Sequence, residues 1–178
     1  MTKFSGRPLA PASDLIVLTA LCAGLGAAAV IDARQRRIPN TVCMATAAAG
    51  LVLAATGVSG ITLASSLAGL AAGFVMMLPG HVLGATGAGD VKLFAAAGTL
   101  LGTGRILPAF LFMAIAGGVL ALAVAWQRGR LGRTMRLTAR LCGRPGELKP
   151  AIESPAEHNR FPYGPAIAVG CVVAALIR

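Results

Sequence analysis

Charged residues are scarce in this chain of 178 residues, and only six of them are acidic. Asp, Glu, Lys and Arg together make up 12% of the chain, about half of the roughly 25% found in soluble domains. So few charges cannot cover the surface of a soluble globular enzyme. Hydrophobic residues make up 56% of the chain, which excludes an intrinsically disordered protein. The composition therefore predicts a polytopic membrane protein.

Metal-binding patterns are missing from the sequence as well. The four cysteines include no CxxC pair and the two histidines lie far apart, so no zinc-ligand spacing is present. We expect no metal and no cofactor, and we interpret the cysteines as small buried thiols. The residues concerned are Cys22, Cys43, Cys142, Cys171, His81 and His158.

Six apolar stretches approach the length of about 20 residues that a membrane-spanning helix needs. They lie at about 15–31, 41–56, 61–79, 90–103, 106–126 and 161–177. The sequence therefore predicts an all-α bundle of about six transmembrane helices that forms one membrane domain over residues 1–178. We expect the first stretch to be retained as a helix rather than cleaved as a signal peptide, because Asp32 and three arginines follow it directly.

Basic residues concentrate on one side of this predicted bundle. Loops 32–40, 80–92 and 127–160 hold 12 of the 16 lysines and arginines, which leaves four on the opposite side. Because basic loops stay in the cytoplasm, we expect these three loops inside and both termini outside. Residues 128–144 are predicted to form a basic amphipathic helix on anionic lipid, with docking of an acidic partner as the alternative. This placement explains the net charge of +10, so we expect no nucleic-acid binding.

Two acidic residues stand where a charge is costly. Asp32 follows the first apolar stretch, and Asp90 lies between the third and the fourth. A carboxylate at membrane depth costs about 2.5–3.5 kcal/mol on insertion scales and is a functional candidate by default. The predicted topology places both on the cytoplasmic side, where they could face each other. In the alternative interpretation, Asp32 pairs with the arginines of 34–37 and Asp90 caps a helix beside Lys92.

The glycines before Asp90 support a special site. Gly84, Gly87 and Gly89 loosen the backbone, which at membrane depth is tolerated only beside protein or a water-filled cavity. They either line a cleft that accepts an extended peptide or allow close helix packing.

Two neighbouring aspartates share one proton, so one can act as a general base towards water and the other as a general acid. This predicts peptide hydrolysis without a metal, with His81 as a nearby supporting residue.

Three motifs, taken in order, resemble those of the type IV prepilin leader peptidases. These are membrane aspartyl proteases of the GxGD class, related in architecture to presenilin-like and preflagellin peptidases. The motifs are Asp-Ala-Arg-Gln-Arg-Arg-Ile-Pro-Asn at 32–40, Gly-Ala-Gly-Asp-Val-Lys-Leu at 87–93 and Phe-Pro-Tyr-Gly-Pro-Ala-Ile-Ala at 161–168. The resemblance implies that Asp32 and Asp90 are the catalytic pair. It assigns to the substrate cleft and its motifs Pro39, Asn40, Gly87, Gly89, Lys92, Pro162 and Tyr163.

The resemblance also implies a function. Such an aspartic endopeptidase, in the bacterial inner (cytoplasmic) membrane, removes a short basic leader from prepilin or pseudopilin precursors at the cytoplasmic face. The small size suits a short Flp-type member. Because residues 2–14 leave no room for a cysteine-pair zinc domain, we do not expect N-methyltransferase activity. A small proton-coupled transporter or channel and a non-enzymatic secretion-assembly scaffold are the alternatives, and neither would lose precursor cleavage when either aspartate becomes asparagine.

Overall fold

The computed structural model describes residues 12–84, 86–127 and 163–177, and 87% of these residues are helical. Within these ranges the chain forms no strand, so the predicted all-α class is confirmed. The helices are α1 (Ala12–Gln35), α2 (Asn40–Ala55), α3 (Leu63–Val82), α4 (Ala88–Gln127) and α7 (Gly164–Leu176). The predicted basic segment 128–144, most of loop 127–160 and Pro162 lie outside the described residues.

The predicted count of about six spans is not confirmed. Three helical stretches are long and apolar enough to cross a membrane, at Ser13–Gln35, Leu63–Val82 and Ala88–Ala123, whereas α2 and α7 are apolar but shorter. The end of the first helix also differs from the prediction. The helix continues to Gln35 instead of ending at residue 31, so Asp32 belongs to the last turn of the helix and does not follow its end.

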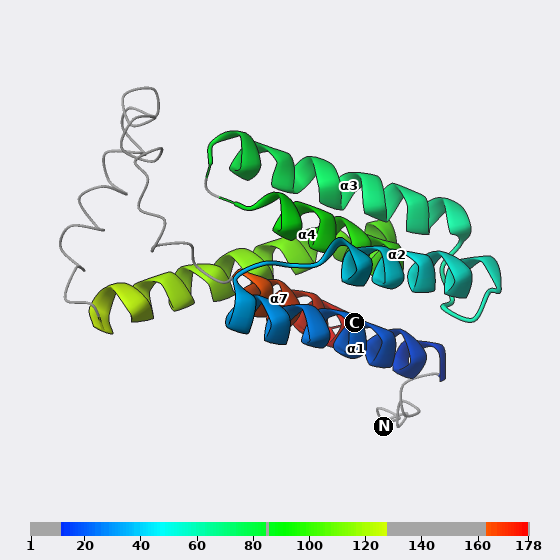
Figure 1. Ribbon diagram of the computed structural model, residues 1–178. Helices are drawn as coiled ribbons and strands as arrows, with labels where there is room; N and C mark the ends of the chain where they lie inside the picture. Colours follow the sequence, from blue (N-terminus) through cyan, green and yellow to red (C-terminus); the bar gives the residue numbers. More distant parts are fainter. Residues whose placement is uncertain (1–11, 85, 128–162, 178) are drawn as a thin grey trace, which may run out of the picture.

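Gly102 divides α4 into two helical segments that correspond to the predicted fourth and fifth helices. Its φ of 64° and ψ of −175° belong to a region that is essentially restricted to glycine. The freed amide of Thr103 donates a hydrogen bond of 3.2 Å to the Ser65 hydroxyl of α3, which satisfies it inside the bundle. The chain therefore reverses at Gly102, and the second segment runs back along the bundle (Figure 1).

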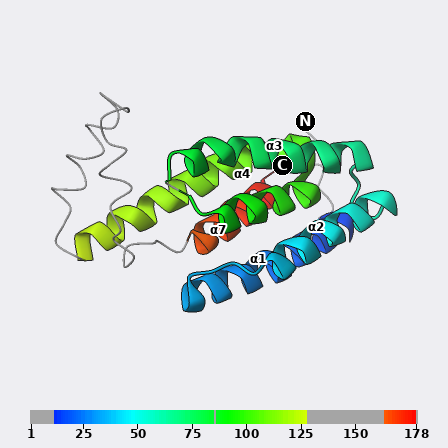
Figure 2. The same ribbon diagram turned by 45° about the horizontal axis from the view of Figure 1, so that its top comes forward.

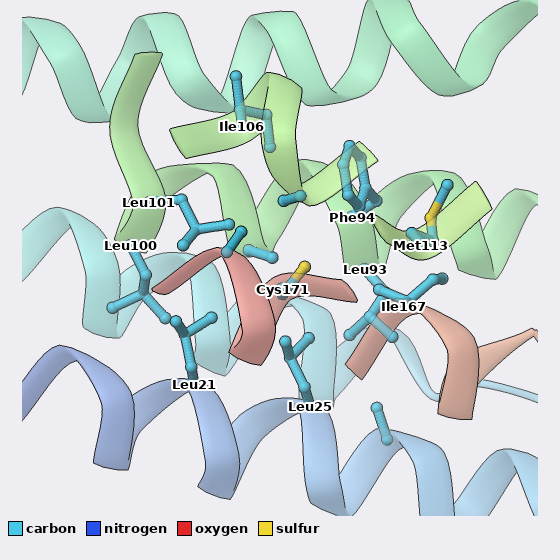
Figure 3. Close-up of a cluster of buried hydrophobic side chains, with 14 of the residues drawn as sticks. Leu21, Leu25, Leu93, Phe94, Leu100, Leu101, Ile106, Met113, Ile167 and Cys171 are labelled. Carbon is cyan, nitrogen blue, oxygen red and sulfur yellow. The ribbon is translucent and has the colours of Figure 1, made fainter. Parts of the chain in front are cut away.

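The core lies where α4, α7 and α1 meet. α3 packs on one side of α4 and α7 on the other, and α1 covers α7 (Figures 1 and 2). Figure 3 shows Leu21 and Leu25 of α1 pointing towards Ile167 and Cys171 of α7, which lie between α1 and α4. All four side chains are fully buried. The interpretation of the cysteines as buried thiols is correct for Cys171 and Cys43, and it is wrong for Cys22, which is exposed on α1.

Glycines bring α3 and α4 into close contact. A Cβ on Gly69 of α3 or on Gly98 of α4 would collide with the backbone of the other helix, and a Cβ on Gly73 would lie 3.1 Å from the carbonyl oxygen of Phe94. Helices in membranes associate through such small residues, because close backbone approach provides van der Waals contact. This packing fixes the first segment of α4, which carries Asp90 near its beginning.

The two ends of the bundle carry different polar groups. At one end, Arg105 of α4 forms an ion pair of 3.6 Å with Asp14 of α1. At the other end, the C-terminal end of α1 lies with the N-terminal ends of α4 and α7 (Figure 1). Asp32 and Asp90 therefore lie at the same end, as the predicted alternation of helices and loops requires.

Candidate active site

Asp32 is buried at the end of α1, with 6% of its surface exposed. Its Oδ2 accepts a hydrogen bond of 2.9 Å from the amide of Gly164, the first residue of α7. Free amides at a helix N-terminus stabilise a negative charge. A Cβ on Gly164 would lie 3.0 Å from both Cβ and Oδ2 of Asp32, so the glycine allows this close approach. The start of α7 is thus built directly against the carboxyl group.

Asp90 is the third residue of α4 and is 8% exposed. Its Oδ2 accepts a hydrogen bond of 3.0 Å from the amide of Gly87, which directly precedes the helix. This bond is the reciprocal half of a capping box. The capping role that the alternative interpretation gave to Asp90 is therefore present. Its pairing with Lys92 is not found among the described residues, because the Lys92 ammonium donates to Oδ1 of Asn40, at 3.1 Å.

The two carboxyl groups share one arrangement. Each is held at Oδ2 by a backbone amide at the start of a helix. No described residue donates a hydrogen bond to the Oδ1 atom of either carboxyl group. Over the described ranges, Asp14 with Arg105 is the only ion pair, so the alternative pairing of Asp32 with the arginines of 34–37 is not found. Both carboxyl groups lie at the end of the bundle where α1 ends and α4 and α7 begin (Figure 1). Carboxyl groups can take up and release protons, which is what acid–base catalysis of peptide hydrolysis requires.

Side-chain contacts join the first motif to the second. Ile38 packs against Gly89, where an added Cβ would lie 3.2 Å from the Ile38 Cβ. The Cys43 thiol lies 4.0 Å from the carbonyl oxygen of Gly89, and Lys92 reaches Asn40. The loop after Asp32 is therefore fixed against the first turn of α4.

The remaining predicted residues that the structure describes lie at the starts of α2, α4 and α7. Pro39 is the N-cap of α2, and Tyr163 is the N-cap of α7 with its ring against Gly117 of α4. Gly87 donates to Asp90, whereas Gly89 is already helical and packs against Ile38 of the loop between α1 and α2.

Sequence reasoning missed two contacts of the site. The sequence marks Gly164 only as part of the third motif, although a glycine at the start of an apolar helix supplies a free amide for an anion. Cys43 had no signal beyond its place in an apolar stretch. Among the residues that the structure describes, no group of three His, Cys, Asp or Glu side chains could hold a metal ion.

Comparison with known proteins identifies the family. A model of the type IV leader peptidase family matches residues 19–122, more than half of the chain, and this range contains both Asp32 and Asp90. Searches of curated proteins and of solved structures found no match. The apolar helices and the family agree in indicating an integral membrane protease. The chain therefore belongs to the type IV leader peptidase family.

Proposed function

We propose that this protein is an aspartic endopeptidase that removes the basic leader of Flp-type prepilins at the cytoplasmic face of the bacterial inner membrane. Asp32 and Asp90 are the proposed catalytic pair. One observation carries the proposal: two buried carboxyl groups lie at one end of a membrane bundle, and each is oriented by a backbone amide at a helix start. Membership of a leader peptidase family supports a prepilin substrate.

In the proposed reaction, one carboxylate takes a proton from a water molecule as the water oxygen attacks the carbonyl carbon of the scissile peptide. The other carboxyl group is protonated and donates to the carbonyl oxygen. The tetrahedral intermediate then collapses. The carbon–nitrogen bond breaks, and the leaving nitrogen takes the proton that the first carboxylate removed from water. One hydroxyl of the intermediate returns its proton to the second carboxylate as the carbonyl group forms again. The products are the leader with a new carboxyl end and the pilin with a new amino end, and the pair shares one proton again.

The charge asymmetry of the loops supports the proposed orientation. Loop 32–40 and residues 80–92, which adjoin the carboxyl groups, belong to the basic side of the chain, so this end is proposed to face the cytoplasm with both termini outside. The basic segment 128–144 is proposed to rest on anionic lipid on the same side.

The proposal is tested with Asp32→Asn and Asp90→Asn. Asparagine keeps an oxygen that can accept the Gly164 or Gly87 amide, but it cannot transfer a proton. Because general acid–base catalysis contributes about 10²- to 10⁴-fold, we expect cleavage to fall at least about 100-fold in each variant. Co-expression with an Flp-type prepilin from the same chromosomal neighbourhood, followed by a gel shift of the leader, measures this loss.

Asp14→Asn provides the matched control, because Asp14 lies at the opposite end of the bundle beside Arg105. We expect this variant to insert into the membrane and to cleave like the wild type. Retained cleavage by the Asp32 or Asp90 variant would refute the catalytic pair. A cut on the periplasmic side of the precursor would refute the orientation.

A further inference from the structure

The short connection between α3 and α4 is tied to the end of α3 by backbone and side-chain bonds. Nδ1 of His81 lies 3.1 Å from the carbonyl oxygen of Thr86, and the amide of Thr86 donates to the carbonyl oxygen of Gly80 at 3.2 Å. A carbonyl oxygen can only accept, so Nδ1 of His81 carries the proton of the first bond. Thr86 is therefore held to the last turn of α3 on both sides of its α-carbon.

The next link leads directly to a carboxyl group of the site. The carbonyl of Thr86 and the amide of Gly87 belong to one planar peptide group, whose two ends point in opposite directions. His81 donates to one end of this group, and the other end donates to Oδ2 of Asp90 at 3.0 Å. The orientation of the amide that faces Asp90 is thus fixed by the bond at the far end of the same peptide.

We propose that His81 is a positioning residue for the leader peptidase reaction. It holds the Thr86–Gly87 peptide group so that the amide stays aimed at Asp90, and it polarises that group through consecutive hydrogen bonds. This inference rests on the proposed function, since it assumes that Asp90 takes part in cleavage. His81 itself touches no reacting atom.

Two further observations indicate that the backbone of Thr86, and not its side chain, holds this connection. The Thr86 hydroxyl is buried and has no hydrogen-bond partner among the described residues, so it does not hold the connection. A Cβ on Gly80 would lie 3.2 Å from Oγ1 and Cγ2 of Thr86, which shows how closely this residue is seated on α3. Within the part of the chain that the structure describes, His81 is then the one side chain that bonds this peptide group on the α3 side.

The test compares two substitutions at one position. His81→Asn places a side-chain N–H where Nδ1 stands, whereas His81→Leu removes the donor and keeps a side chain of moderate size. For the loss of one hydrogen bond we expect kcat to fall about 5- to 10-fold in His81→Leu, with KM changed by less than about twofold. We expect His81→Asn to stay within about twofold of the wild type in both constants.

A second measurement does not depend on cleavage. Amide hydrogen exchange of the peptide that contains Gly87 should be faster in His81→Leu than in the wild type, and His81→Asn should restore the slow rate. Wild-type kcat in His81→Leu, or equal impairment of the Asn and Leu variants, would overturn the positioning role. If the wild-type protein cleaves no prepilin, the proposed function fails, and the exchange comparison still decides whether His81 holds the Gly87 amide.

Discussion

The contact between α7 and Asp32 predicts that one added methyl group, in Gly164→Ala, slows cleavage. In Gly164→Ala the new Cβ would lie 3.0 Å from Cβ and Oδ2 of Asp32 and 3.3 Å from the backbone Cα of Ala29. The Ala29 backbone belongs to α1 and cannot rotate away, as a flexible side chain would. The start of α7 must therefore move by a few tenths of an ångström, and the 2.9 Å bond from the residue-164 amide to Asp32 lengthens.

The expected loss of activity follows from the strength of that bond. A hydrogen bond to a charged group contributes about 1.5–3 kcal/mol. If the bond is lost and Asp32 is no longer oriented, cleavage falls about 10- to 100-fold. The free energy of unfolding should change less than the activation free energy of cleavage. Overpacking costs about 1–3 kcal/mol, and replacing a helical glycine by alanine offsets up to about 1 kcal/mol of this cost. The variant is therefore expected to be folded and slow.

The assay is the rate of leader removal by purified protein, measured beside thermal unfolding of the same sample. Gly26→Ala is the matched control, because it adds the same methyl group to α1 at a position where nothing lies within 4 Å of the new Cβ. This control should cleave at the wild-type rate and gain up to about 1 kcal/mol of stability. If Gly164→Ala cleaves as fast as Gly26→Ala, the amide of residue 164 does not orient a catalytic carboxylate.

Two further predictions concern the bond between Asn40 and Lys92, which joins the first two motifs, and the packing of α3 on α4. Asn40→Ala and Lys92→Met should each lower kcat about two- to fivefold, and the double variant should be no slower than the slower single one, because both remove the same 3.1 Å bond. Fully additive losses in this cycle would show that the two residues act separately. Gly69→Val should unfold at a lower temperature, since the backbone of α4 blocks its side chain, whereas Gly118→Ala, in open space, should not. Equal unfolding temperatures of these two variants would contradict the packing.

The lengths of the apolar stretches and the acids between them allowed the class and the common end of Asp32 and Asp90 to be predicted. The position of the helix break was predicted only approximately: the stretches 90–103 and 106–126 leave the break at 104–105, whereas the structure has it at Gly102. The sequence alone does not show whether Gly102 or Gly104 carries the break. The structure distinguishes them by their surroundings: a Cβ on Gly102 would lie 2.7 Å from the Ser65 hydroxyl of α3, whereas nothing lies within 4 Å at Gly104. Only the tertiary contact with α3 decides which glycine carries the break.

The partners of the carboxyl groups were also beyond sequence reasoning. The alternative interpretation of the sequence gave both carboxyl groups basic partners, and Lys92 stands two residues from Asp90. The structure uses backbone amides instead, and Lys92 bonds Asn40. Amides carry no signature of their own in a sequence, so their role appears only once the helix starts are placed in space.

Because backbone amides are the donors, a steric argument explains why glycine stands at positions 87 and 164 of the motifs. A Cβ on Gly87 would lie 3.1 Å from Oδ2 of Asp90, and one on Gly164 would lie 3.0 Å from Oδ2 of Asp32. When the backbone amide of a residue lies within hydrogen-bond distance of a buried carboxylate, little room remains for a side chain on that residue. A basic side chain could replace such an amide only by bringing a full charge beside the carboxylate, which would oppose its uptake of a proton. An amide fixes the orientation of the carboxyl group without adding that charge, and this is what a pair of aspartates needs if each is to accept and release a proton.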